Sequence, residues 1–223
     1  MSGIITIDGP GGAGKSTVSL LLAKKLDFIY LDTGAMYRAV ALNALRKGIG
    51  FGDLRALYEM CRSIDINFMS TGDNYRVYIG EEDITDEIRR PEMDMLSSKI
   101  SIIKEVRDAM TGLQRRIGRK GRLVAEGRDM GTVVFPDANH KFFLTASREA
   151  RAGRRCAERL GRGESISMEE VETELTKRDE QDETRAIAPL RPADDAIIID
   201  TTPLGVDEVV EKIMVNIRER EKK

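Results

Sequence analysis

Short runs of apolar residues recur along the chain, and each run ends where glycine or polar residues begin. Between several of these runs the apolar positions recur at the spacing of one helix face instead, as in Ser16–Leu26. The short runs are typical of buried strands: Ile4–Ile7, Phe28–Leu31, Leu123–Ala125, Phe142–Leu144 and Ala196–Ile199. Because all-apolar strands that alternate with helices favour a parallel sheet with helices on both faces, the pattern predicts an α/β fold.

One region departs from this alternation and predicts a small antiparallel insertion on the main sheet. The segments Ile64–Phe68 and Tyr75–Ile79 alternate in polarity and flank Thr71–Asn74, whose Gly, Asp and Asn residues favour a hairpin turn. Helical patterns resume from about Pro91 to Arg119. We find no linker between independent domains, so we expect a single domain over residues 1–223.

Composition and charge narrow the classes of function. The chain carries 36 basic and 38 acidic residues, for a net charge of −2, whereas nucleic-acid-binding proteins usually carry a basic surplus. No apolar run approaches the roughly 18 residues of a membrane span, and the N-terminus lacks the features of a secretion signal. We therefore expect a cytoplasmic protein that binds neither nucleic acid nor membrane, with Cys61 and Cys156 as reduced thiols and His140 in a loop or on the surface.

Residues Gly9–Ser16 fit the phosphate-loop pattern G-x-x-x-x-G-K-[ST], directly after a predicted strand and directly before a predicted helix. Glycines let backbone N–H groups turn inward around phosphate oxygens, and the helix adds its positive N-terminal end. In this pattern Lys15 reaches the β- and γ-phosphates and Ser16 binds Mg²⁺. We expect the ATP phosphates to be bound by Gly9, Pro10, Gly11, Gly12, Ala13, Gly14, Lys15, Ser16 and Thr17.

A rival cue, for a guanine-nucleotide switch, lies at Thr176–Asp179, which matches the pattern T-K-x-D. In GTPases that pattern follows a buried strand. Here it lies within Glu169–Arg185, which is charged and helical in pattern and has no strand before it. We interpret this match as coincidence, and a phosphate loop alone does not name the reaction.

Two polar segments follow predicted strands, at the edge where a parallel sheet presents ligand-binding residues. After the second strand, Asp32 could orient waters on Mg²⁺ while Thr33 and Arg38 hold an acceptor. The alternative is that Asp32 caps a helix and Arg38 is solvated. After the third strand, Arg128 and Asp129 stand between glycines and either face the same ligand crevice or pair only with each other.

A basic helix predicts a lid. Arg151, Arg155 and Arg159 stand four residues apart, and like charges at that spacing repel, so a bound anion is the natural compensation. The helix runs into the glycine-flanked loop 161–163, which is typical of a mobile segment that brings arginines onto transferring phosphates. The alternative is a solvated stripe that Glu158 partly neutralises.

A second helical face carries Arg178, Asp182 and Arg185. It is either a surface ion-pair ladder or a site where both arginines bind phosphate while Asp182 orients them or accepts from a sugar hydroxyl.

A phosphate monoester that acts as the phosphoryl acceptor needs no carboxylate base, because its second pKa of about 6 leaves it ionised at neutral pH. It needs charge screening, and arginines around a phosphate loop supply that. The arginines therefore favour a kinase whose acceptor is itself phosphorylated.

Four longer motifs carry a family resemblance: I-T-I-D-G-P-x-G-A-G-K at 5–15, D-T-G-A-M-Y-R at 32–38, G-R-D-M-G-T-V-V-F-P-D-A at 127–138 and R-A-I-A-P-L at 185–190. Together they make the chain similar, nearly from end to end, to the bacterial cytidylate kinases, which are P-loop nucleoside-monophosphate kinases. The predicted hairpin matches the extra segment that distinguishes this family from shorter monophosphate kinases.

The resemblance implies a P-loop NTPase-like three-layer fold with a five-stranded parallel sheet, a monophosphate-binding arm and a lid. The core would comprise residues 1–32, 120–147 and 190–223. The arm would comprise residues 33–119, with the β insertion at about 61–99, and the lid would lie at about 148–165.

The resemblance also implies roles, position by position. Cytosine would be read by Ser98, Arg107 and Asp129. The acceptor phosphate and sugar would be bound by Thr33, Arg38, Arg128, Arg178, Asp182 and Arg185. The phosphate-loop pattern and the arginine spacing, rather than the resemblance, lead us to expect catalysis by Lys15, Arg128, Arg151, Arg155 and Arg178. The same patterns lead us to expect Mg²⁺ at Ser16 and Asp32.

The implied activity is transfer of the γ-phosphoryl group of ATP to CMP or dCMP, with Mg²⁺, in pyrimidine nucleotide metabolism, by a protein that we expect to be monomeric. The enzyme alternative is a P-loop kinase for another phosphorylated acceptor, such as UMP, dTMP or dephospho-coenzyme A. The non-enzyme alternative is a nucleotide-dependent regulatory switch, against which the arginine-rich acceptor residues argue.

Overall fold

The structure is a computed structural model that describes residues 3–71 and 74–221. The chain divides into two compact units. The first comprises Met1–Tyr30 and Lys120–Lys223, and the second comprises Leu31–Arg119. No helix in the described ranges is both long and apolar enough to cross a bilayer.

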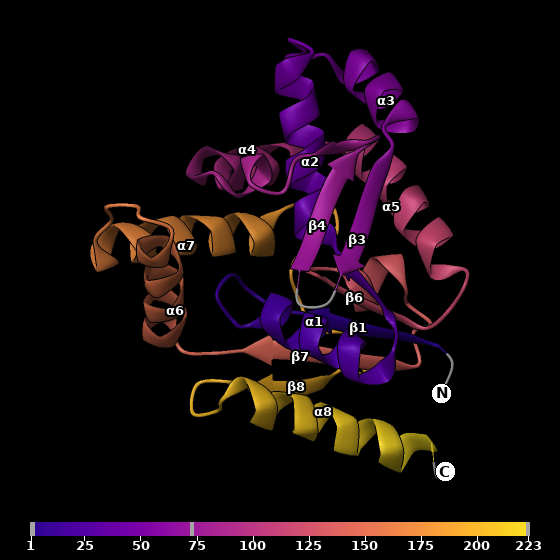
Figure 1. The fold of residues 1–223 in the computed structure, drawn as a ribbon, viewed down its shortest axis with the longest axis vertical. Helices are drawn as coiled ribbons and strands as arrows, with labels where there is room; N and C mark the ends of the chain where they lie inside the picture. The colour runs from indigo at the N-terminus through magenta and orange to yellow at the C-terminus, as the bar shows by residue number, and fades with distance from the viewer. Residues whose placement is uncertain (1–2, 72–73, 222–223) are drawn as a thin grey trace. The chain divides into compact units, whose positions relative to one another are not determined.

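A five-stranded parallel sheet lies largely in the first unit, and its strand β2 runs across the boundary between the two units in the chain. Figure 1 labels the strands β1, β6, β7 and β8 of this sheet. Its spatial order is β2-β6-β1-β7-β8, so that β1, which leads into the phosphate loop, lies in the middle. The apolar side chains of the central strands are buried, as the uninterrupted apolar runs predict. The strands are β1 (Ile4–Asp8), β2 (Ile29–Asp32), β6 (Leu123–Gly127), β7 (His140–Thr145) and β8 (Ile197–Asp200). The predicted α/β fold, with helices around such a sheet, is confirmed.

The helices of this unit are α1 (Lys15–Leu26), α6 (Arg148–Gly161), α7 (Met168–Thr184) and α8 (Val206–Glu221). Helix α1 packs against β6 and α8, while α6 and α7 pack on each other (Figure 1). A capping box starts α7, because the Ser167 hydroxyl and the Glu170 carboxylate satisfy each other's backbone N–H groups. The apolar contact between α6 and α7 is a small cluster of Ala152, Cys156, Val171 and Leu175, with Ile166 beside it.

The second unit combines helices with a three-stranded antiparallel sheet. Its helices are α2 (Thr33–Arg46), α3 (Leu54–Ser63), α4 (Pro91–Ser101) and α5 (Lys104–Gly118), with a short 3₁₀ turn, η1 (Glu87–Arg89). The predicted hairpin is present as β3 (Ile66–Thr71) and β4 (Asn74–Ile79), and residues 72 and 73 of its predicted turn lie outside the described residues.

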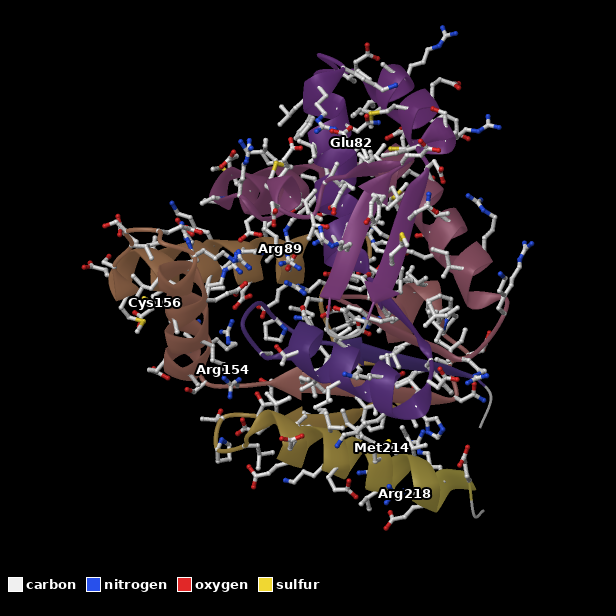
Figure 2. All side chains as sticks on the ribbon, in the orientation of Figure 1. Glu82, Arg89, Arg154, Cys156, Met214 and Arg218 are labelled. Carbon is white, nitrogen blue, oxygen red and sulfur yellow. The ribbon has the colours of Figure 1, made fainter. Side chains whose placement is uncertain are left out.

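The sequence analysis missed the third strand of this sheet, β5 (Glu82–Asp83). It is only two residues long and carries two acidic side chains, so it has no apolar pattern to reveal it. It is fixed instead by polar contacts: Arg46 of α2 donates to Glu82, which is labelled in Figure 2, and to Glu87 of η1.

The expectation that His140 lies in a loop or on the surface is wrong. His140 is the first residue of β7, is 8% exposed, and pairs in register with Ile5 of β1. Its burial lowers the pKa of the imidazole. The run Phe142–Leu144 marks only the centre of the strand, and β7 begins two residues before that run.

Candidate active site

The loop between β1 and α1 has a backbone conformation that requires glycine. Gly12 and Gly14 have φ angles of 75° and 88°, in the left-handed region that other residues rarely adopt. A Cβ atom on Gly12 would lie 2.8 Å from the carbonyl oxygen of Arg151, so the first turns of α6 pack directly against the loop. The strand, glycine loop and helix therefore follow one another as the phosphate-loop pattern requires.

Lys15 is buried and folds back over this loop. Its Nζ atom donates to the carbonyl oxygen of Pro10 at 2.7 Å. Burial, and after it the positive charge of Arg128, lowers the pKa of the Lys15 ammonium to about 7. A polyphosphate bound beside Nζ would raise this pKa again, because a nearby negative charge favours the charged form. Lys15 is thus poised to gain a full positive charge when an anion binds.

Glu126 is a candidate site residue to which the sequence analysis gave no role. One carboxylate oxygen accepts from the Ser16 hydroxyl at 3.1 Å, and the other accepts from the Tyr30 hydroxyl. Glu126 is buried, although its neighbours in β6 are apolar. An acidic residue inside an otherwise apolar strand is the sequence signal that could have identified it.

The oxygen ligands present fit Mg²⁺ bound mainly through substrate phosphates. Mg²⁺ is usually held by one or two protein oxygens together with water and phosphate. The Ser16 hydroxyl donates to Glu126, which leaves its lone pairs for a cation. Asp32 caps α2 by accepting from the N–H of Ala35 at 2.8 Å, and a carboxylate can accept further contacts. No group of three or more His, Cys, Asp or Glu side chains in the described ranges is arranged for a metal.

Buried ion pairs link the loop after β6 to α7. Arg128 donates from Nε to Asp182 at 2.7 Å, and Arg185 lies 3.7 Å from Asp182 and 3.5 Å from Asp129. Burial acts to raise the pKa of the Asp182 carboxyl, but the charges of Arg128, Arg178 and Arg185 together lower it.

These ion pairs decide two alternatives that the sequence left open. Arg128 and Asp129 do not pair only with each other, because Arg128 pairs with Asp182 and Asp129 pairs with Arg185. Arg178, Asp182 and Arg185 are not an exposed ladder either, because the Asp182 and Arg185 side chains are almost fully buried. A compact group of arginines and carboxylates at this position can bind phosphate.

The three arginines of the predicted basic stripe on α6 form ion pairs. Arg151 is buried and donates to the backbone oxygen of Gly11 at 3.1 Å, and it forms an ion pair with Asp179. Arg155 pairs with Glu158 at 2.7 Å, as the alternative interpretation of this stripe anticipated. Arg159 pairs with two further acidic residues, Glu164 and Glu174.

Thr201 links α6 to the phosphate loop by further hydrogen bonds, which were not expected from the sequence. Arg154, labelled in Figure 2, donates to the Thr201 hydroxyl at 2.9 Å and to the Thr201 carbonyl at 2.6 Å. The Thr201 hydroxyl in turn donates to the carbonyl of Ala13 at 3.1 Å.

The T-K-x-D match at residues 176–179 lies inside α7, so no strand directly precedes it. Its Asp179 forms the ion pair with Arg151.

In the second unit, α2, α4 and α5 carry four of the residues expected at the acceptor. Arg38 of α2 donates to Asp94 of α4 at 2.9 and 3.0 Å, so it is not simply solvated. Arg107 of α5 is buried, donates to the Ser101 carbonyl at 3.0 Å, and holds its guanidinium carbon 5.8 Å from the ring centre of Tyr37. Ser98 of α4 and Thr33 at the start of α2 are buried as well.

Comparison with known proteins places the whole chain in one family. The sequence model of the family described as cytidylate kinase matches residues 5–219. A cytidylate kinase of Geobacter sp. (strain M21) is 50% identical over 217 residues, which cover 97% of this chain and 93% of the relative. A cytidylate kinase of Carboxydothermus hydrogenoformans is 50% identical over 210 residues, which cover 94% and 95% of the two chains.

Solved structures of other kinases share the fold alone. A shikimate kinase from Acinetobacter baumannii has a TM-score of 0.50 at 16% identity, over 99% of this chain and 96% of its own. A gluconokinase from Sinorhizobium meliloti has a TM-score of 0.50 at 13% identity, over 99% and 94%. The family match includes the phosphate loop, the segment after β6 and the arginines of α6 and α7. The chain belongs to the cytidylate kinase family.

Proposed function

We propose that the protein transfers the γ-phosphoryl group of ATP to CMP or dCMP, giving ADP and CDP or dCDP. One observation carries the proposal: the family match over residues 5–219 includes both the phosphate loop and the buried arginine–carboxylate group. A P-loop fold alone is compatible with many reactions, and the two kinases that share it here at low identity illustrate this.

The reaction is an in-line displacement. An oxygen of the CMP phosphate forms a bond to the γ-phosphorus of ATP while the bond from that phosphorus to the bridging oxygen breaks, and ADP leaves. The CMP phosphate is already ionised near neutral pH, so no side chain has to remove a proton from it. Catalysis is then alignment and stabilisation of charge on the transferring group.

Cationic side chains supply that stabilisation in the proposed mechanism. Lys15 contacts the β- and γ-phosphates, and the transferring group is surrounded by Arg128, Arg151, Arg155 and Arg178. Arg128 and Arg151 are paired with Asp182 and Asp179. These ion pairs fix the positions of the two arginines.

CMP binding in this proposal uses arginines for the phosphate and polar side chains for the base. Its phosphate contacts Arg38, Arg128, Arg178 and Arg185, with Asp182 at the sugar and Thr33 nearby. Its base is recognised by Ser98, Arg107 and Asp129. Cytosine carries an amine that donates to Asp129 and Ser98, and acceptors that receive from Arg107. Uracil reverses the polarity of that edge.

Mg²⁺ fits the same proposal as the cofactor of ATP. When bound, it neutralises phosphate charge, and Ser16 and Asp32 are the residues of this chain that would hold it. We further propose that the protein acts as a cytoplasmic monomer in pyrimidine nucleotide metabolism.

The test is release of ADP from ATP and Mg²⁺ in the presence of single nucleoside monophosphates, with the product identified by chromatography. We expect fast ADP release and formation of CDP or dCDP only with CMP or dCMP. Equal ADP release with and without CMP would indicate a regulatory switch. Preference for UMP, dTMP or dephospho-coenzyme A would indicate a kinase for another acceptor.

A further inference from the structure

A buried carboxylate at the end of β1 has no role in the site as described so far. Asp8 is 4% exposed. Its Oδ1 atom accepts from the N–H of Met130 at 2.9 Å, and its Oδ2 atom accepts from the N–H of Gly131 at 2.8 Å. An ionised carboxylate can accept at both oxygens, so Asp8 fixes the orientation of two consecutive peptide groups.

Those two peptide groups begin the π-helical turn η2 (Met130–Val134), which directly follows Asp129. A Cβ atom on Gly131 would lie 2.9 Å from Oγ1 of Thr6 and 3.4 Å from Oδ2 of Asp8. The start of η2 is therefore pressed against the face of β1 that carries Thr6 and Asp8, two residues apart. The backbone on the C-terminal side of Asp129 has little room to move.

Asp129 is thus held in two ways. Asp8 fixes the peptide groups that follow it, and Arg185 lies 3.5 Å from its carboxylate. Asp129 is itself buried. A side chain that has to distinguish an amine from a carbonyl must be held within a fraction of an ångström, and such positioning comes from contacts behind the residue.

The charged groups around Asp8 make its own charge sensitive to mild acid. The pKa of Asp8 is raised to about 6, mainly by burial and further by the Asp129 carboxylate. The backbone N–H groups of Gly131 and Met130 and the charge of Lys15 lower it in part. Lys141 on the neighbouring strand faces the same side but is engaged by Asp195 at 2.9 Å. Asp8 is ionised at neutral pH and becomes protonated in mild acid, when one oxygen turns from acceptor to donor.

We propose that Asp8 is a positioning residue for base selectivity: its carboxylate holds the backbone after Asp129 so that the Asp129 side chain meets the cytosine amine. The inference rests on the proposed function, because it needs cytosine as the base. Asp8 does not touch the substrate. Loss of its charge releases η2 and lowers the preference for CMP over UMP, while the phosphate loop continues to bind ATP.

The first test is Asp8→Asn, which keeps the shape and replaces one acceptor oxygen with an NH₂ group that faces a backbone N–H. We expect the ratio of kcat/KM for CMP to that for UMP to fall by about tenfold or more, with KM for ATP within about threefold of wild type. The matched control is Thr6→Val on the same face of β1, where Oγ1 has no hydrogen-bond partner in the described part of the chain. This control should keep the wild-type ratio. An unchanged ratio in folded Asp8→Asn protein would overturn the inference.

The second test needs no variant and decides the question if Asp8→Asn fails to fold. The CMP-to-UMP ratio of kcat/KM is measured on wild type from about pH 8 to about pH 5.5. Titration of the shared acceptor phosphate and of Lys15 affects both substrates and cancels in the ratio. We expect the ratio to fall in wild type as the pH drops through about 6. A flat ratio in wild type would contradict the inference.

The two tests separate this inference from the proposed function. If wild type prefers CMP at about pH 8, and neither Asp8→Asn nor a lower pH changes that preference, the proposed function stands and the role of Asp8 is excluded. Wild type without a preference for CMP at that pH loses the proposed function itself.

Discussion

The phosphate loop and the arginine-bearing helices α6 and α7 would bind the same kind of ligand by different means. The loop offers backbone N–H groups in a conformation set by glycines with positive φ, and its single cation, Lys15, rests on a backbone carbonyl. On α6 and α7 the cations are guanidinium groups paired with carboxylates, as in Arg151 with Asp179. The loop presents these N–H groups through its backbone alone, whereas the arginines would have to share or exchange their carboxylate partners to bind phosphate.

The loop and the ion-paired arginines are therefore expected to contribute differently to catalysis and to stability. A backbone anion site loses little free energy in reorganisation when phosphate binds, so its side-chain cation is free to act on the transition state. A buried arginine–carboxylate pair is costly to break on one side only, because removal of one partner leaves an uncompensated charge. Substitutions in the loop should therefore affect catalysis most, and substitutions among the ion pairs should affect both stability and catalysis.

The largest effect is expected for Lys15→Met. Removal of the one cation of the loop should lower kcat by about 10³-fold or more, because oriented charge is the main catalytic contribution. The measurement is kcat on folded protein at saturating ATP and CMP. Lys24→Met, at an exposed position near the end of the same helix, is the matched control and should keep wild-type kcat. Near-normal turnover in folded Lys15→Met protein would exclude the assigned role of the loop.

The Arg128–Asp182 pair separates stability from catalysis. Arg128→Met should lower kcat/KM for CMP by about 10²-fold, and should destabilise the fold because Asp182 loses its 2.7 Å partner. The double variant Arg128→Met with Asp182→Asn removes both charges, so the free energy of unfolding should recover in part while kcat/KM does not. Recovery of both quantities together would show that the pair serves only the fold.

Arg151 and Arg155 compare a buried and a half-buried arginine on one helix. Each change to alanine should lower kcat more than it raises KM for CMP, by about 30-fold for Arg151 and by less than about tenfold for Arg155. The difference is expected because Arg151 donates to the carbonyl of Gly11 in the phosphate loop, whereas Arg155 pairs with Glu158 three residues along its own helix. If unfolding free energies change and kinetic constants do not, neither arginine acts on the transferring group.

The smallest effect is on acid stability. The arginines around Asp182 lower its folded-state pKa below the unfolded value near ~3.9. Asp182 therefore contributes stability that is fully present above the unfolded pKa and is lost as the pH falls through the folded one. Urea unfolding at stepped pH should show this acid loss in wild type and a shallower loss in Asp182→Asn. Asp108→Asn, in an exposed pair with Lys104, is the control and should change the profile little.

The sequence predicted those parts of the molecule that local pattern determines. Apolar runs located all five parallel strands, and the glycine spacing of residues 9–16 located the phosphate loop. The strand Glu82–Asp83 and the burial of His140 were missed, because both depend on contacts with other segments.

Site chemistry was predictable by residue type but not by partner. The spacing of arginines indicated a phosphate acceptor, yet nothing local indicates that Arg151 meets Asp179 or that Asp8 accepts from η2. Those pairs are 28 and 122 positions apart, and only the packing of α6 on α7 and of η2 on β1 brings them together. Long-range pairs of single polar residues leave no periodic signal in a sequence.

Recognition of cytosine is tested by the ratio of kcat/KM for CMP to that for UMP on the wild-type protein at about pH 8, with ATP and Mg²⁺. A site whose buried polar groups match cytosine and are left unpaired by uracil should favour CMP by at least about a hundredfold. Parity between CMP and UMP would contradict the cytosine site and would leave only a nucleoside-monophosphate kinase of another specificity.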